Sequence, residues 1–194
     1  MKILIACEES QEVCKAFRAK GHEAFSCDIL PPSGGHPEWH IQGDVLEHLN
    51  DGWDMMIAHP PCTYITNAGA VHLYPKGKLN EERLKKGIDA VYFFRRLLDA
   101  PIAKICVENP VPSTVYGLPK YTQTIQPYEH GHPFSKKTCL WLKGLEPLKP
   151  TNIVTERQST KVAGNWFNKG GKDRQINRSK TFPGIAKAMV EQWV

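Results

Sequence analysis

The sequence lacks an apolar run long enough to cross a membrane. The apolar stretch near its start, Lys2–Ala6, is also too short for the core of a secretory signal peptide. We therefore expect a cytoplasmic protein that makes no membrane contact.

Cysteine pairs of the C-x-x-C type are absent as well. Six cysteines are scattered over 194 residues, a spacing that suits neither a zinc knuckle nor a small disulfide scaffold. Two histidine pairs, His36 with His40 and His130 with His132, have no third ligand beside them, so we expect no metal site. Most of the cysteines should pack as small buried side chains. Cys62 needs a separate explanation.

Internal repeats and signs of a second domain are also missing. Hydrophobic residues make up 41% of the chain and charged residues 23%, which is ordinary for a folded globular protein. A chain of 194 residues is long enough to bury one continuous core. We expect a single domain that spans residues 1–194.

Positive charge is concentrated in residues 146–180. Eight cations and three anions fall there, so this segment carries the whole net charge of +5. A basic stretch with aromatic residues suits contact with phosphates and bases, although a solvated basic loop explains it equally well. The candidate nucleic-acid contacts in this segment are Lys161, Trp166, Lys169, Lys172, Arg174 and Arg178.

Short apolar runs alternate with helical patterns in the first half of the chain. The runs at 2–7, 23–28, 53–58 and 103–107 predict buried strands. Alternation of this kind is typical of a parallel α/β sheet. From Tyr121 to Leu142 the pattern becomes extended, which predicts antiparallel additions to the sheet. The fold class is therefore α/β, with a Rossmann-like and mostly parallel sheet.

Three helices stand out between and after these runs. Ser10 is a candidate cap for a helix that places Val13 and Phe17 on one face. Asn80 caps a second helix, and a third covers 185–193. The apolar face of the second helix is predicted to consist of Leu84, Ile88, Val91 and Leu98.

Chemically distinctive residues follow three of the predicted strands, where open α/β sheets bind ligands. Two prolines before Cys62 hold the chain extended and rigid. Cys62 is therefore a candidate nucleophile, and a structural turn is the alternative. Glu108 ends an apolar strand, so we expect burial to raise its pKa, unless it is an ordinary structural acid. A thiolate and a carboxyl group together suit addition to C6 of a flipped pyrimidine, with support at N3.

The order of these segments resembles that of the cytosine-C5 DNA methyltransferase family, especially its short phage-encoded forms. Residues 60–69 resemble the catalytic P-P-C segment and its loop, and 107–110 resemble the E-N-V segment. Residues 131–138 lie where the family has a glutamine–arginine–arginine pattern, and 181–186 resemble its last motif. The resemblance implies that Cys62 is the nucleophile, Glu108 the partner of cytosine N3, and Lys136 an auxiliary cation.

The same resemblance implies S-adenosylmethionine as the cofactor and double-stranded DNA as the partner. Asp28 would bind the ribose hydroxyls and Asp44 would lie near the adenine amino group. Asn67, in the loop after the nucleophile, would contact DNA. The remaining cofactor-binding candidates are Cys7, Glu8, Pro60 and Pro183.

The chain departs from the family in two places. Its first turn, residues 7–12, has three acids and no glycine, so the acids either cap the following helix or face the positive charge of the donor. Its target-recognition region is reduced to about residues 146–180. Two alternatives follow: a related pyrimidine-C5 enzyme with RNA, a free nucleotide or a modified donor, and a non-catalytic nucleic-acid-binding relative.

Overall fold

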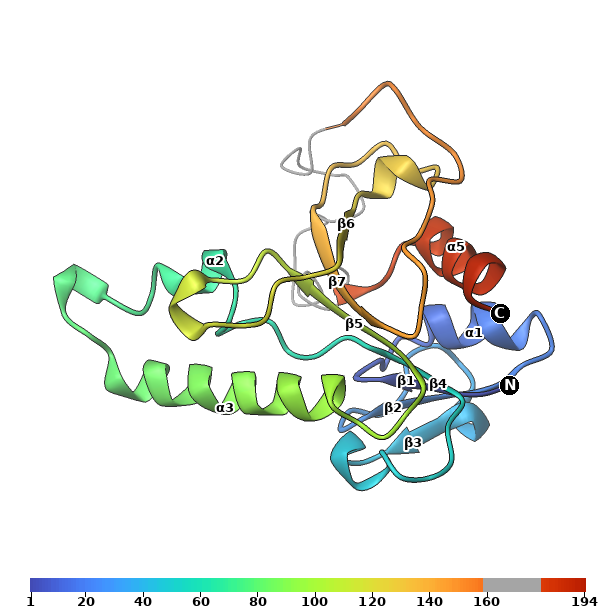
Figure 1. The fold of residues 1–194 in the computed structure, drawn as a ribbon, viewed down its shortest axis with the longest axis horizontal. Helices are drawn as coiled ribbons and strands as arrows, with labels where there is room; N and C mark the ends of the chain where they lie inside the picture. The colour runs from blue at the N-terminus through green and yellow to red at the C-terminus, as the bar shows by residue number, and fades with distance from the viewer. Residues whose placement is uncertain (159–178) are drawn as a thin grey trace.

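The computed structural model describes residues 1–158 and 179–194. Its centre is a seven-stranded sheet in the order β3-β2-β1-β4-β5-β7-β6 (Figure 1). The strands are β1 (Lys2–Ala6), β2 (Glu23–Asp28), β3 (His40–Gln42), β4 (Met55–Ala58), β5 (Lys104–Pro110), β6 (Gln123–Ile125) and β7 (Thr138–Lys143).

Most of the sheet is parallel, as the sequence predicts. Strands β3, β2, β1, β4 and β5 run in one direction, whereas β7 is antiparallel to both of its neighbours, β5 and β6. The strand order reverses direction between β1 and β4, which is the position where ligands bind in doubly wound sheets. The Rossmann-like α/β class is confirmed, and its antiparallel part is β7.

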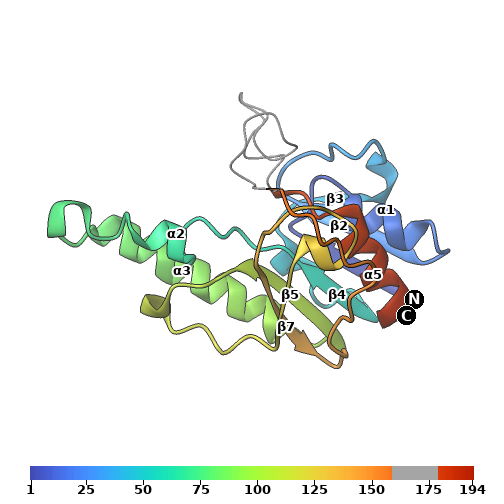
Figure 2. The ribbon, with the colours of Figure 1, turned by 90° about the horizontal axis from the view of Figure 1, so that it is seen from above.

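The sheet is covered on both faces. Helices α1 (Glu12–Arg18) and α5 (Pro183–Trp193) pack together on one face, and Figures 1 and 2 show them beside the two chain ends. Helix α3 (Glu81–Leu98) packs against β5 through Phe94 and Leu97 and extends away from the sheet toward α2 (Asn67–Ala70). Alternate residues of β1 therefore belong to two cores: Ile3 lies on the α1 side and Leu4 on the α3 side.

The cap predicted for α1 is wrong. Gln11, not Ser10, is the N-cap residue, and its side chain makes no capping hydrogen bond. The buried carboxylate of Glu8 accepts the backbone N–H groups of Val13 and Cys14 at 2.7 and 3.2 Å. A tight turn after β1 brings Glu8 back over the start of the helix, so an acid five residues before Val13 satisfies donors that a local cap would otherwise satisfy.

The cap of α3 is confirmed, but part of its apolar face is wrong. The Asn80 side chain accepts the N–H of Arg83 at 2.9 Å. Ile88 is 56% exposed, because the buried face contains its neighbour Gly87. A Cβ atom on Gly87 would lie 2.3 Å from the ring of Tyr116, so this glycine allows the ring to contact the helix backbone.

In the described part of the chain, no helix combines the length and the apolar character that a membrane crossing requires. Within residues 1–158 and 179–194, no group of three or more histidine, cysteine or acidic side chains is arranged to hold a metal ion.

Candidate active site

The candidate residues gather at the carboxyl edge of the parallel strands. Cys7 follows β1, Asp28 ends β2, and His59 follows β4. Glu108 lies within β5, one register position beyond the Ala58–Val107 pair, so it lies beside His59. The sheet thus brings together residues that are up to 101 positions apart, from Cys7 to Glu108.

The Cys62 segment is tied to the segment that follows Glu108. Backbone hydrogen bonds join the N–H of Ser113 to the carbonyl of Ile65 at 2.8 Å and the N–H of Asn67 to the carbonyl of Val111 at 3.1 Å. Pro60 is buried, Cys62 is partly exposed, and the side chain of Asn67 is exposed at the start of α2. The predicted nucleophile therefore lies in a loop that is anchored next to the predicted N3 partner.

His59 and Glu108 form a buried pair. Nδ1 of His59 lies 3.1 Å from Oε2 of Glu108, and the two side chains are only 9% and 19% exposed. Burial alone would raise the pKa of Glu108, but the hydrogen bond from His59 and the positive charges of His59 and Lys136 lower it below its ordinary value. The expectation of a raised pKa for Glu108 is therefore wrong, because it ignored the histidine of the neighbouring strand.

Lys136 lies on the opposite side of Glu108 from the strand that carries His59. It precedes β7, and its charge acts on both members of the pair. The three side chains line one small cavity of about 20 Å³, room for about one water molecule. The other residues of its wall are Ile125, Thr138, Ser179, Lys180, Thr181, Phe182, Ile185 and Met189.

The closing segment lies against the same cavity. Phe182 and Ile185 contribute to its wall, and Pro183 between them is exposed at the first position of α5. The backbone N–H of Gly184 donates to Nε2 of His132 at 2.9 Å. A Cβ at Gly184 would overlap the carbonyl of His130, so the glycine permits this close approach. Pro183 therefore lies in the segment that covers the Glu108 cavity, at one end of the carboxyl edge of the sheet.

A second cluster surrounds Cys7. Burial raises the pKa of the Cys7 thiol, and the negative charges of Asp28, Cys27 and Asp44 raise it further. Burial also raises the pKa of Asp28, and the charge of Glu9 adds to this effect. Carboxylates around a protonated thiol can accept hydrogen bonds from hydroxyl groups and can attract a cation.

The turn after β1 has a shape that glycine usually provides. Cys7 and Gln11 both have φ of 59°, a left-handed conformation that costs about 1 kcal/mol or more for a residue with a Cβ atom. Glu8 uses its carboxylate to cap α1, whereas Glu9 is partly exposed near Asp28. Of the two functions considered for these acids, Glu8 has the capping function.

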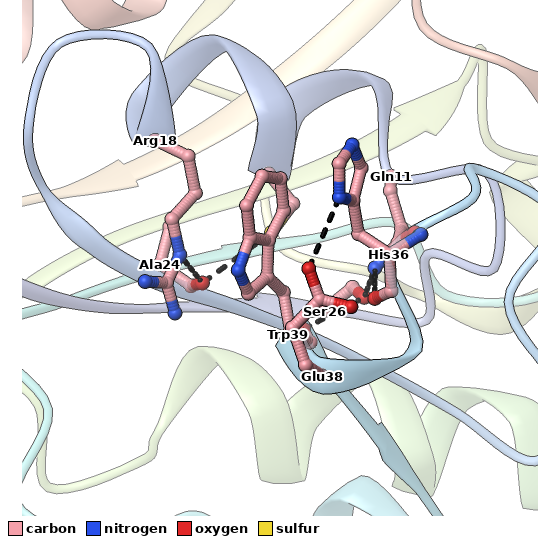
Figure 3. Close-up of polar contacts among 8 residues, drawn as sticks. Gln11, Arg18, Ala24, Ser26, His36, Glu38 and Trp39 are labelled. Atoms are coloured by element: carbon pink, nitrogen blue, oxygen red, sulfur yellow. Dashed lines mark hydrogen bonds and ion pairs between the residues drawn. The ribbon is translucent and has the colours of Figure 1, made fainter.

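Gln11 holds the loop after β2 in place, a function that the sequence did not reveal (Figure 3). Its amide donates to the carbonyl of His36 at 2.8 Å and to Oγ of Ser26 at 3.2 Å, and it accepts the N–H of His36 at 3.1 Å. The N–H of Ser33 donates to the carbonyl of Glu9 at 2.8 Å. The loop therefore lies directly over the first turn.

The remaining predicted residues have simpler settings. Asp44 is exposed and accepts the N–H of Leu46 at 2.9 Å as the cap of a short 3-10 helix. The predicted nucleic-acid contacts Lys161, Trp166, Lys169, Lys172, Arg174 and Arg178 lie outside the described residues.

No family model and no curated protein matches this chain. Several solved structures are similar in fold, among them the following three. A DNA modification methyltransferase encoded within an E. coli prophage has a TM-score of 0.48 and 15% identity, with 79% of this chain and 52% of that chain covered. The Entamoeba histolytica methyltransferase EhMeth has a TM-score of 0.47 and 11% identity, with 81% of this chain and 57% of that chain covered. The S. pombe Dnmt2 methyltransferase has a TM-score of 0.42 and 11% identity, with 81% of this chain and 51% of that chain covered. The chain spans little more than half the length of each.

Proposed function

We propose that this protein is a short, phage-type DNA cytosine-C5 methyltransferase that uses S-adenosylmethionine and acts in the cytoplasm of a bacterial host. One observation carries this function: the loop of a partly exposed cysteine is hydrogen-bonded to the segment after a buried glutamate, at the ligand-binding edge of the sheet. Addition to a pyrimidine ring requires a nucleophile and a carboxyl group that can reach the same base, and these hydrogen bonds join the two segments that carry them.

In this function Cys62 attacks the base and Glu108 holds it. The Cys62 thiolate adds to C6 of a cytosine flipped out of double-stranded DNA, and the electron density gained by the ring makes C5 nucleophilic. Glu108 faces N3, and Lys136 supplies a nearby positive charge. Loss of the C5 proton then allows the Cys62 sulfur to leave.

The residues around Cys7 fit S-adenosylmethionine. Asp28 and Asp44 provide carboxylates for hydroxyl and amino groups, and the acidic surroundings of Cys7 suit a positively charged sulfonium. When bound, S-adenosylmethionine supplies the methyl group. Pro60 and Pro183 would border the bound donor, Glu8 would shape the first turn, and Asn67 with the basic residues of 146–180 would contact DNA.

Trapping with 5-fluorocytosine tests the function directly. Fluorine at C5 cannot leave as a proton does, so DNA containing this base should form a covalent adduct with the protein only when S-adenosylmethionine is present. Cys62→Ser should form no adduct on a denaturing gel. Cys14→Ala is a matched control, because burial raises the pKa of the Cys14 thiol to about 12 and leaves it unreactive. If wild type and Cys62→Ser behave alike, Cys62 is not the nucleophile.

A second function keeps the pyrimidine chemistry but uses a different donor. The glycine-free first turn favours it, since Cys7 and Gln11 carry side chains where close approach of a ligand to the backbone would favour glycine. Mass spectrometry of nucleosides from treated DNA distinguishes the two. A gain of one methyl group supports S-adenosylmethionine, and any other gain supports a modified donor.

A further inference from the structure

His59 is buried in a way that core packing does not explain. Its side chain is 9% exposed, and Nδ1 is paired with Glu108. Among the described residues, its other ring nitrogen, Nε2, has no hydrogen-bond partner, although that atom is buried. A histidine that only fills space normally has both nitrogens satisfied or exposed. His59 also lines the cavity that it shares with Glu108 and Lys136.

Four ionisable groups alternate in sign across this edge. Glu8 follows β1, His59 follows β4, Glu108 belongs to β5, and Lys136 precedes β7. Glu8, Glu108 and Lys136 are the charged groups that act on His59. Glu8 and Glu108 lie on either side of the strand that His59 follows, since β4 separates β1 from β5. Burying two carboxylates is costly unless a cation lies between them, and the imidazolium of His59 is placed to be that cation.

We propose that His59 is a positioning residue for the methyl-transfer site, which as an imidazolium fixes the Glu108 carboxylate and neutralises it so that the base can approach. This role rests on the proposed function for its effect on catalysis. The pairing itself can be measured without any reaction.

The chemical reason lies in the lone pair of cytosine N3. An isolated carboxylate would repel that lone pair, and the repulsion would grow as the Cys62 sulfur adds to the ring and N3 becomes more negative. A carboxylate paired with an imidazolium carries no net charge, so this repulsion is weaker. The pair uses Oε2 of Glu108, which leaves Oε1 to face the base.

The protonation state of His59 follows from the same contacts. Burial alone would lower the pKa of His59, but its hydrogen bond to Glu108 and the charges of Glu108 and Glu8 raise it above the ordinary value, and Lys136 opposes this in part. These contacts therefore extend the imidazolium to higher pH than in an ordinary histidine, and it is lost as the pH rises through the raised pKa.

An NMR titration of the full chain without ligands tests the pair by itself. The ring signals of His59, assigned by comparison with His59→Gln, should titrate above the ordinary pKa of about 6.5. In Glu108→Gln the same pKa should fall by about one unit or more, because burial remains and the partner charge is gone. An unchanged His59 pKa in Glu108→Gln overturns the proposed pair.

Kinetic pH profiles test the role in catalysis. His59→Ala should lower kcat roughly 10²-fold through misplacement of Glu108. His59→Gln, which keeps an N–H donor, should recover part of this loss and should no longer show the decline of kcat at high pH. His48→Gln is the matched control, since His48 pairs with Asp51 at 2.9 Å on the surface, and it should match wild type. Thermal melts confirm that each variant is folded.

The outcomes separate the two proposals. If wild type forms no adduct with 5-fluorocytosine DNA but His59 shows the raised, Glu108-dependent pKa, the proposed function fails and the pair stands. If methyl transfer occurs and His59→Gln keeps the wild-type decline at high pH, the positioning role of His59 is wrong.

Discussion

The two halves of the candidate site differ in how their charges are arranged. On the side of Glu108, positive and negative groups alternate, and each buried charge has a partner of opposite sign. On the side of Cys7, the charge of Glu9 acts on Asp28, and the charges of Asp28 and Asp44 act on the Cys7 thiol. The first half therefore contains a paired acid, Glu108, whereas Asp28 in the second half has a raised pKa, chiefly because of burial.

This difference affects the stability of the protein as well as its chemistry. The pKa of Glu108 is lowered, so its ionised form is stabilised by the fold. The pKa of Asp28 is raised, by burial above all, so its ionised form is disfavoured by the fold. A carboxylate that destabilises the empty protein is typical of a binding residue, whereas a paired one is a preorganised part of the site.

The largest effect is expected from Glu108→Gln. The amide keeps the size of the side chain but removes the charge that holds His59, so kcat should fall roughly 10²–10⁴-fold, the range for removal of an acid–base group. Methylation rates on double-stranded DNA at saturating donor measure it. Glu129→Gln is a control in which a carboxylate away from the edge is lost, and a rate for Glu108→Gln within a few-fold of that control would place Glu108 outside the reaction.

Asp28→Asn should affect the Cys7 half of the site, and there only the binding of S-adenosylmethionine. Loss of a charge-assisted hydrogen bond costs about 1.5–3 kcal/mol, which corresponds to roughly 10- to 150-fold in the Kd for S-adenosylmethionine. At saturating donor kcat should change little, because Asp28 does not touch the base. Calorimetry measures the Kd, with Asp54→Asn as an exposed control. Equal donor binding by Asp28→Asn and wild type would remove Asp28 from the donor site.

Much of this edge could be predicted from local sequence. The strand at Glu23–Asp28 has both of its predicted ends. A short apolar run between turn residues can be recognised from neighbouring residues alone. The cap at Asn80 is confirmed for the same reason. The order of the segments led us to expect Glu108, Lys136 and the closing segment near one another, and Phe182 and Ile185 line the same cavity as Glu108 and Lys136.

Contacts between distant segments could not be predicted. His59 and Glu108 are 49 residues apart, and the sign of the pKa shift of Glu108 depends on that one contact. Glu8 caps α1 only because Cys7 adopts a left-handed turn, and nothing local predicts such a turn at a cysteine. The exposure of Ile88 depends on Tyr116, which packs against Gly87. The errors at Glu108 and Ile88 come from partners far along the chain, and the error at the α1 cap comes from an unusual local turn.

The two acids should have opposite effects on the free energy of unfolding. Glu108→Gln removes the charged partner of His59 and the hydrogen bond between them, and should cost about 1.5 kcal/mol at pH 7. Asp28→Asn should instead stabilise the empty protein, by a few tenths of a kcal/mol after screening by solvent. Urea denaturation measures both.

The pH dependence of the two effects follows from the direction of each pKa shift. The lowered pKa of Glu108 gives stability that is present above its unfolded pKa, about 4.3, and lost as the pH falls through the folded value. The raised pKa of Asp28 costs stability at neutral pH, and that cost disappears as the pH falls toward about 4. Urea curves at pH 5 and pH 7 should show the gain from Asp28→Asn shrinking at the lower pH. If Glu108→Gln and Asp28→Asn changed the free energy of unfolding in the same direction at pH 7, the distinction between a paired and an unpaired acid would be wrong.

Gly34→Ala should have a small effect on ligand binding, confined to the Cys7 half of the site. A Cβ atom there would lie 2.5 Å from Cβ of Gln11 and 2.6 Å from the carbonyl oxygen of Ser10, so the loop must move off the first turn. Loss of the hydrogen bond from Ser33 to Glu9 should cost about 1 kcal/mol and weaken donor binding several-fold, with no change in the rate of adduct formation at saturating donor. Ser33→Ala keeps the backbone N–H and its side chain is exposed, so it should behave as wild type. Calorimetry and adduct kinetics on the same samples test this prediction. If the adduct formed more slowly while the affinity for the donor stayed unchanged, the loop would act on the Glu108 half, and the two halves would not be independent.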